Sequence, residues 1–126
     1  MAETKTLLIV DDNPLTREGL RLILRQKGYE TILATNGNDA LDCLRAGSSP
    51  DLILLDMLMP ITDGWQFLSQ LRREFSSPLV PVIVISSIGL SNEWAKDRGC
   101  CAFIGKPIDP DSLLTEVQQS LERCKG

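Results

Sequence analysis

Short runs of consecutive apolar residues recur along the chain, each followed by polar or turn-forming residues. A run of four or five such residues without alternation is typical of a strand buried on both faces of a sheet. The run 52–55, which leads directly into Asp56, is the clearest example. On this basis we predict strands at residues 6–10, 30–34, 52–55, 82–85 and 102–105.

Between these runs, apolar residues recur every three or four positions, which is the spacing of one helix face. In the first such segment, residues 14–27, Leu20 and Leu24 lie on one face, Asn13 can cap the helix and Gly28 ends it. The other predicted helices follow the turn 36–39, begin at 63–64, span 91–99 and begin at 109–110.

The third predicted helix, which begins at 63–64, has one face toward the core and one toward solvent. Its pattern assigns Trp65, Leu68 and Leu71 to the buried face. Arg72 and Arg73 near its end are expected to lie in solvent.

Five strands alternate with five helices, which predicts an α/β fold. Such alternation favours a doubly wound, five-stranded parallel sheet with right-handed crossovers. A length of 126 residues is enough for one domain with an ordinary core.

The composition narrows the class of protein. A net charge of −4 and a pI of about 4.8 argue against direct nucleic-acid binding. No apolar run approaches the roughly 20 residues of a membrane span. The first residues have neither the basic region nor the apolar segment of a signal peptide. We therefore expect a cytoplasmic protein with no membrane partner.

The four cysteines do not suggest a metal site. Their spacing fits no zinc pattern, and the chain has no histidine. We expect all four to be reduced, small hydrophobic side chains. They are Cys43, Cys100, Cys101 and Cys124.

Chemically active residues follow four of the predicted strands. Asp11 and Asp12 follow the first, Asp56 the third, Ser86 the fourth and Lys106 the fifth. Each alone could cap a helix or begin a turn. Together, at the carboxyl edge of a parallel sheet, they predict a site. Mg²⁺ binds carboxylates, and a neighbouring carboxylate can form an aspartyl-phosphate, with a lysine to neutralise phosphoryl oxygens.

These residues resemble those of the receiver domains of two-component response regulators, similar to the chemotaxis regulator, over nearly the whole chain. The matching positions are Asp11-Asp12, residues 56–60 with Asp63-Gly64, Ser86, and Lys106-Pro107. The resemblance implies a flavodoxin-like fold with strand order 2-1-3-4-5. It also implies one receiver domain over residues 1–126, with a core of about 5–124, that acts as a signalling module rather than an enzyme.

The resemblance also implies residue roles. Asp56 would accept a phosphoryl group from a histidine kinase or a histidine phosphotransfer protein. Asp12 would bind Mg²⁺ directly and Asp11 chiefly through water, with Asp56 and the backbone carbonyl of Leu58 as further ligands. Lys106 would contact the phosphoryl group.

A switch is implied as well. Ser86 would bind a phosphoryl oxygen, Phe103 would move inward, and a face that binds a downstream effector would change. The bond before Pro107 would be cis. Two positions that rim the phosphoryl pocket in receivers are apolar here, Leu58 and Ile88, so the phosphorylated form is expected to lose its phosphoryl group slowly.

Three alternatives remain open. A degenerate receiver would bind partners without phosphorylation. A phosphatase with an aspartyl-phosphate intermediate would usually place its nucleophile after the first strand, with a second acid two residues on. Here the residue two positions after Asp56 is Leu58. A flavin carrier of the same fold would need a phosphate cradle where Asp11 and Asp12 would repel phosphate.

Overall fold

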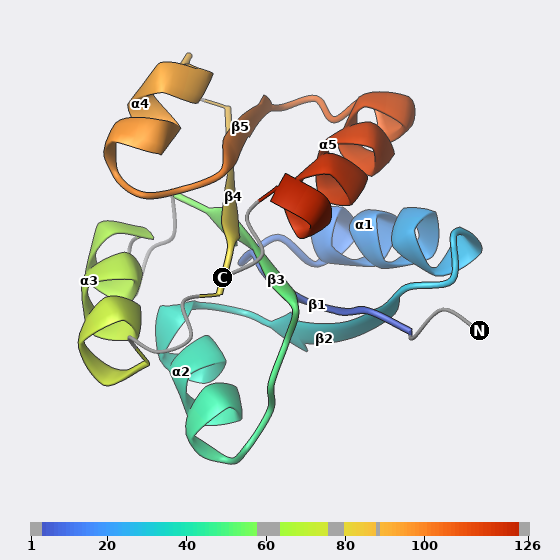
Figure 1. Cartoon of the computed structure of the whole chain (residues 1–126). Coiled ribbons are helices and arrows are strands. Elements are labelled where there is room, and N and C mark those ends of the chain that lie inside the picture. Colours follow the sequence, from blue (N-terminus) through green and yellow to red (C-terminus); the bar gives the residue numbers. More distant parts are fainter. Residues whose placement is uncertain (1–3, 58–63, 76–79, 88, 124–126) are drawn as a thin grey trace.

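A parallel sheet forms the centre of the computed structural model, which describes residues 4–57, 64–75, 80–87 and 89–123 (Figure 1). The strand order is β2-β1-β3-β4-β5, and each neighbouring pair is parallel. The predicted fold class and strand order are therefore confirmed. The strands are β1 (Thr6–Val10), β2 (Glu30–Ala34), β3 (Leu52–Asp56), β4 (Val82–Ser86) and β5 (Ala102–Gly105).

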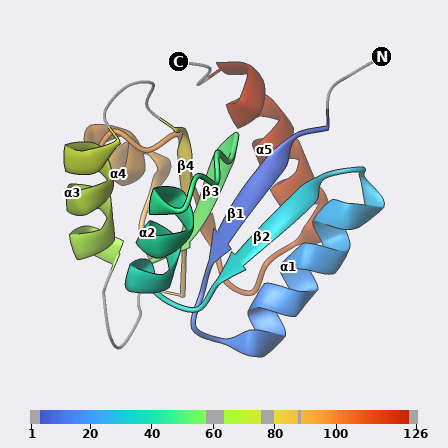
Figure 2. The same cartoon turned by 90° about the horizontal axis from the view of Figure 1, so that it is seen from below.

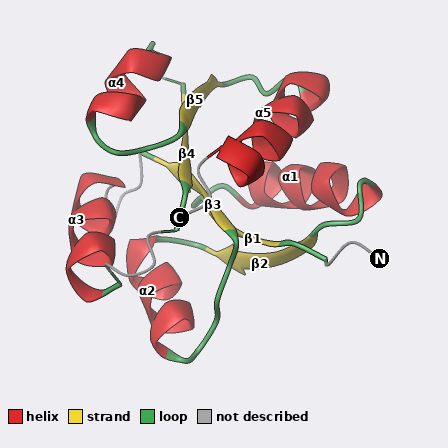
Figure 3. Ribbon diagram, viewed as in Figure 1, coloured by secondary structure: helices red, strands yellow, loops and turns green. Residues whose placement is uncertain are grey.

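Helices cover both faces of the sheet (Figure 3). Two of them, α1 and α5, lie on one face, and α2, α3 and α4 lie on the other (Figure 1). The crossover from β1 to β2 runs in the opposite direction along the sheet from the crossovers that lead to β3, β4 and β5. Because crossovers between parallel strands are right-handed, α1 lies on one face and α2, α3 and α4 lie on the other. The helices are α1 (Pro14–Gln26), α2 (Gly37–Arg45), α3 (Gly64–Glu74), α4 (Asn92–Asp97) and α5 (Pro110–Arg123).

The core consists of two apolar clusters, one on each face of the sheet. Leu7 and Ile9 of β1 pack into the cluster with α1 and α5. Leu8 and Val10 pack into the cluster beneath α2, α3 and α4. Because successive strand residues point to opposite faces, a strand covered on both sides needs an unbroken apolar run.

Side chains fix the start of α1 and α2 as the sequence indicates. The Asn13 carboxamide oxygen accepts hydrogen bonds from the backbone N–H groups of Leu15 and Thr16, at 2.9 and 3.4 Å. Gly28, with φ of 86°, follows the end of α1. Asn36 caps α2 by accepting from the N–H of Asp39 at 2.8 Å.

The sheet register brings the ends of the central strands together. Val10 lies opposite Leu55, Asp56 opposite Ile85, and Ser86 opposite Gly105. The arrowheads of β1 and β2 in Figure 2 point the same way, as in every pair of this sheet. The residues that follow β1, β3, β4 and β5 consequently meet at one edge.

Helix α3 departs from its predicted orientation. Its buried residues are Gly64, Phe67, Leu68 and Leu71, whereas Trp65 is 47% exposed. The prediction that Trp65 is buried is therefore wrong, because fully buried Phe67 occupies the core-facing position beside it.

The solvent assignment of Arg72 is also wrong. Its guanidinium donates hydrogen bonds to the carbonyls of Arg98 and Gly99, at the end of α4. These bonds join α3 to α4 across a gap of more than twenty residues in sequence.

Two further expectations are corrected. Cys101 is disulfide-bonded, whereas Cys43 and Cys100 are free thiols, so the cysteines are not all reduced. Disulfide pairing depends on the distance between side chains in the fold, which sequence spacing does not show. The predicted helix 91–99 is shorter, since Ser91 is the cap of α4 and Arg98 ends it.

No helix in the described ranges is long and apolar enough to cross a membrane.

Candidate functional site

Three carboxylates meet where β1 and β3 end. Asp11, Asp12 and Asp56 each offer an oxygen, and these oxygens all lie within 4.8 Å of one another. Asp11 and Asp56 are buried, while Asp12 is exposed. The structure thus brings together the acids that the sequence predicts to converge, with one of them open to solvent.

Lys106, which follows β5, supplies the positive charge of this cluster. Its ammonium Nζ donates to Asp11 Oδ2 at 3.1 Å and to Asp56 Oδ2 at 3.4 Å. Burial of the ammonium lowers the pKa of Lys106, but the hydrogen bonds and charges of Asp11 and Asp56 outweigh that effect and raise the pKa above its ordinary value. Lys106 is therefore a stable cation at neutral pH, held between two buried carboxylates.

The chain after β1 orients Asp11 through two contacts that the sequence analysis did not identify. The backbone N–H of Asn13 donates to Asp11 Oδ1 at 2.9 Å. The Arg17 guanidinium donates to the Asp11 carbonyl at 2.7 Å. Arg17 lies on the first turn of α1, so its position near the start of the helix was the available signal.

The predicted switch residues lie on β4 and β5. Ser86 is fully buried at the end of β4. Phe103 is half-buried and, like Leu90 and Trp94, packs against the apolar cluster beneath α2, α3 and α4. Its backbone N–H donates to the Asn92 side chain at 2.9 Å, which ties β5 to the start of α4.

The remaining predicted positions divide into two groups. The Lys106–Pro107 peptide bond is cis, the form that the resemblance implies. Leu58, whose carbonyl is a predicted metal ligand, and Ile88, predicted to rim the pocket, lie outside the described residues, as does Asp63.

The donor set of the acidic cluster fits a hard divalent cation. Mg²⁺ is bound through one or two carboxylates and keeps several waters. Here all three donors are carboxylate oxygens, and exposed Asp12 leaves room for water on the solvent side. Asp11, Asp12 and Asp56 are the residues that would hold it.

Residues 7–118 match the family described as response regulator receiver domain. Response regulator Rre1 from Synechocystis is 37% identical over 98% of this chain, which spans 54% of that protein. The chain therefore covers about half of Rre1. Protein PilH from Pseudomonas aeruginosa is 31% identical, over 91% of this chain and 96% of PilH.

Solved structures give the same result. The receiver domain of Francisella response regulator 1452 superposes with a TM-score of 0.84 and 25% identity, over 97% of this chain and all (100%) of that one. A signal receiver domain of a histidine kinase from Syntrophus aciditrophicus has a TM-score of 0.81 and 31% identity, over 94% of this chain and 91% of that one. From its sequence, its sheet topology and its acidic cluster, the chain belongs to the receiver domains of two-component response regulators.

Proposed function

We propose that Asp56 accepts a phosphoryl group from a phosphohistidine, carried by a histidine kinase or a histidine phosphotransfer protein. The phosphorylated form then binds a downstream effector differently. One observation carries this proposal: the Lys106 ammonium is held between the buried carboxylates of Asp11 and Asp56. Receiver domains are signalling modules rather than enzymes, and they typically bind Mg²⁺ in an acidic pocket.

In the proposed transfer, a carboxylate oxygen of Asp56 attacks phosphorus. An O–P bond forms, the P–N bond to the donor imidazole breaks, and the imidazole leaves with the electron pair and takes up a proton. Lys106 donates hydrogen bonds to the phosphoryl oxygens, because it already lies at hydrogen-bonding distance from Asp56.

Mg²⁺ held by Asp11, Asp12 and Asp56 would neutralise negative charge on these carboxylates and on the incoming phosphoryl group. The chain itself keeps Asp11 in place through Asn13 and Arg17. Exposed Asp12 leaves the cluster open on the side from which a donor must arrive.

The surface beside Lys106 supports a protein as the phosphoryl donor. A hollow of about 280 Å³ lies between α1 and the segment after β5, lined in part by Lys106, Pro107 and Ile108. Leu15, at the start of α1, is 83% exposed. Leu15 precedes Thr16, which lines the hollow, and a docking protein could cover both the exposed leucine and the hollow.

The alternatives have less support. A degenerate receiver would not need the complete set of Asp11, Asp12, Asp56 and Lys106, all of which are in contact or close approach here. A phosphatase would need a second acid two residues after its nucleophile, and Leu58 occupies that position.

Phosphorylation by a small donor tests the proposal. Acetyl phosphate with Mg²⁺ should add one phosphoryl group to the protein, as seen by intact-mass spectrometry, and the Asp56→Asn variant should stay unmodified. Chelating the metal should stop the reaction, since unneutralised carboxylates would repel the donor. Asp97→Asn, an exposed aspartate on α4, is the matched control and should react like wild type. Labelling of Asp56→Asn to the wild-type extent would reject Asp56 as the acceptor.

A further inference from the structure

Trp65 lies on the surface of α3 and is held there by its neighbours. Its ring meets that of Trp94 edge to face, with centroids 5.2 Å apart and planes 74° apart. The Arg98 guanidinium lies 4.3 Å from the Trp94 ring centroid and 5.0 Å from that of Trp65. An exposed indole that is fixed in this way presents a preorganised apolar surface, since little side-chain entropy remains to be lost on binding.

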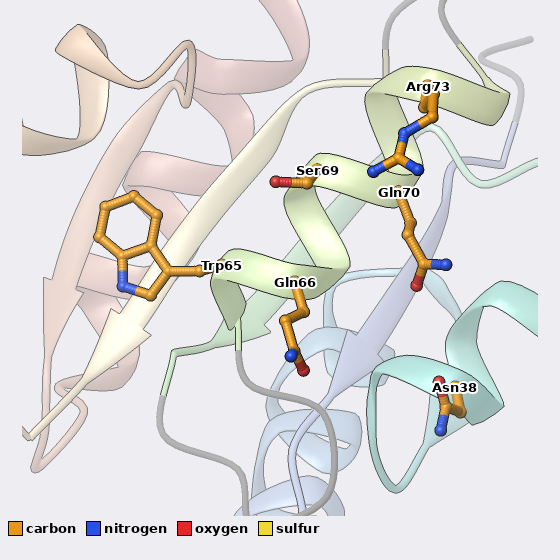
Figure 4. A pocket seen from close by; sticks show the side chains of 6 residues that line it. All are labelled: Asn38, Trp65, Gln66, Ser69, Gln70 and Arg73. Carbon is orange, nitrogen blue, oxygen red and sulfur yellow. The ribbon is translucent and has the colours of Figure 1, made fainter.

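Beside this indole is a hollow of about 460 Å³ between α3 and the start of α2. Its size is within the range of pockets that bind small ligands. Figure 4 shows Gln66 and Gln70 extending from α3 toward Asn38 at the start of α2, while Trp65 extends in another direction from the start of α3. The six lining residues are Asn38, Trp65, Gln66, Ser69, Gln70 and Arg73.

From these residues we propose that the α3 face, meaning these six residues, is a docking surface for an extended acidic segment of a partner protein. The carboxamides of Asn38 and Gln70 each carry both a donor and an acceptor, so they can pair with the N–H and C=O groups of an extended peptide backbone. Trp65 would contact an apolar side chain of that segment. Tryptophan and arginine are the residue types that most often carry binding energy in protein interfaces.

The charge of the surface selects an acidic partner. None of the six lining residues carries a carboxylate, and Arg73 forms no ion pair among the residues that the structure describes. Arg45, in contrast, forms ion pairs with Glu74 and Asp42. The charge of Arg73 also acts on neighbouring Glu74, but Glu74 is itself paired with Arg45. On a chain of net charge −4, Arg73 is therefore a specific place for a partner's carboxylate to bind.

The α3 face is separate from the acidic cluster. It shares no residue with Asp11, Asp12, Asp56 or Lys106. Binding there can thus be measured on unphosphorylated protein, and its result does not depend on the proposed role of Asp56.

The test uses three acetylated and amidated pentapeptides. In the first, glutamate alternates with leucine; in the second and third, glutamine or lysine replaces glutamate. Titrations into ¹⁵N-labelled protein are followed by two-dimensional NMR. The glutamate peptide should shift the Trp65 indole signal and the backbone signals of α3, with a dissociation constant at least about tenfold lower than that of either other peptide. Raising the salt concentration should weaken binding of the glutamate peptide.

Charge reversal provides the decisive comparison. Arg73→Glu should lose binding of the glutamate peptide and gain binding of the lysine peptide at the same signals. Arg25→Glu, which reverses an exposed arginine in the last turn of α1, should bind as wild type does. Equal binding of the three peptides, shifts confined to other elements, or no shift at millimolar peptide would overturn the proposal. So would sedimentation showing that this face joins two copies of the chain.

Discussion

At the scale of single residues, the acidic cluster concentrates like charge. Three carboxylates with oxygens within 4.8 Å face one ammonium, which leaves two net negative charges. Like charges at this distance destabilise the folded state unless a cation balances them. Such an unbalanced cluster supports the proposed binding of a cation and a phosphoryl group, for which stability is given up at a functional site.

Replacing Asp12 should separate the stability of the metal-free protein from the stability that it gains on binding Mg²⁺. In metal-free buffer, Asp12→Asn should be at least as stable as wild type, because one of three like charges is removed. At a Mg²⁺ concentration ten times the dissociation constant, wild type should gain about 1.4 kcal/mol of unfolding free energy, while the variant gains much less. Thermal melts with and without Mg²⁺ measure this, with Asp97→Asn as a control of equal charge change. Equal Mg²⁺ responses in Asp12→Asn and wild type would exclude Asp12 as a ligand.

Two apolar residues should lengthen the life of the phosphorylated form. Leu58 and Ile88 cannot hydrogen-bond or orient a hydrolytic water, whereas a polar side chain could. We expect Leu58→Asn or Ile88→Glu to lose phosphate faster than wild type, by roughly tenfold at most. Phosphate release from the purified phosphoprotein, with Mg²⁺ and without a kinase, gives the rates. If folded forms of both variants decay no faster than wild type, these side chains do not set the lifetime.

At the scale of elements, α3 is the helix that connects the site to the rest of the surface. Its first residue, Gly64, donates its N–H to the Met57 carbonyl at 3.2 Å, just past β3. Its last turn reaches α4 through Arg72. Its exposed side carries Trp65, in contact with Arg98 and Trp94 of the α4 region. Displacement of α4 would therefore reach the α3 face through direct contacts.

The close approach at Gly64 predicts a sharp effect of one methyl group. A Cβ there would clash with Met57 Sδ and would lie 2.8 Å from Met57 Cα, and the backbone cannot move aside as a flexible side chain can. Gly64→Ala should therefore lower the unfolding free energy by about 1–3 kcal/mol. Gly19→Ala, in the interior of α1 with nothing within 4 Å, is the matched control and should raise it by about 0.5–1 kcal/mol. Urea denaturation distinguishes them, and equal stability of the two variants would contradict the packing at Met57.

At the scale of the whole molecule, two apolar clusters share one sheet. Each central strand contributes to both, as Ile53 and Leu55 do on one side and Leu52 and Leu54 on the other. Loss of either cluster would expose one face of the sheet and remove packing that holds the strands on which the other cluster is built. The two faces should consequently unfold together.

This cooperativity can be measured with two probes. Trp65 and Trp94 lie on the α3 and α4 side, so their fluorescence reports one face, whereas far-UV circular dichroism also reports α1 and α5. Urea transitions followed by both signals should have the same midpoint and slope. An earlier loss of fluorescence than of helicity would show that the α3 and α4 side unfolds separately.

The sequence by itself determined the strands, their parallel arrangement and the convergence of Asp11, Asp56 and Lys106. A strand covered on both faces requires an unbroken apolar run, and such runs are legible without a structure. Alternation with helices then leaves one edge of the sheet where polar residues after these strands can meet.

The tertiary structure decided what depends on neighbours far along the chain. Helical periodicity allowed either Trp65 or Phe67 to face the core, and packing against the sheet selected Phe67. Arg72 reaches the α4 end only because α3 and α4 lie side by side, and the bonding of Cys101 likewise depends on distances in space. Local pattern specifies elements, but the identity of each partner is fixed only when the elements pack.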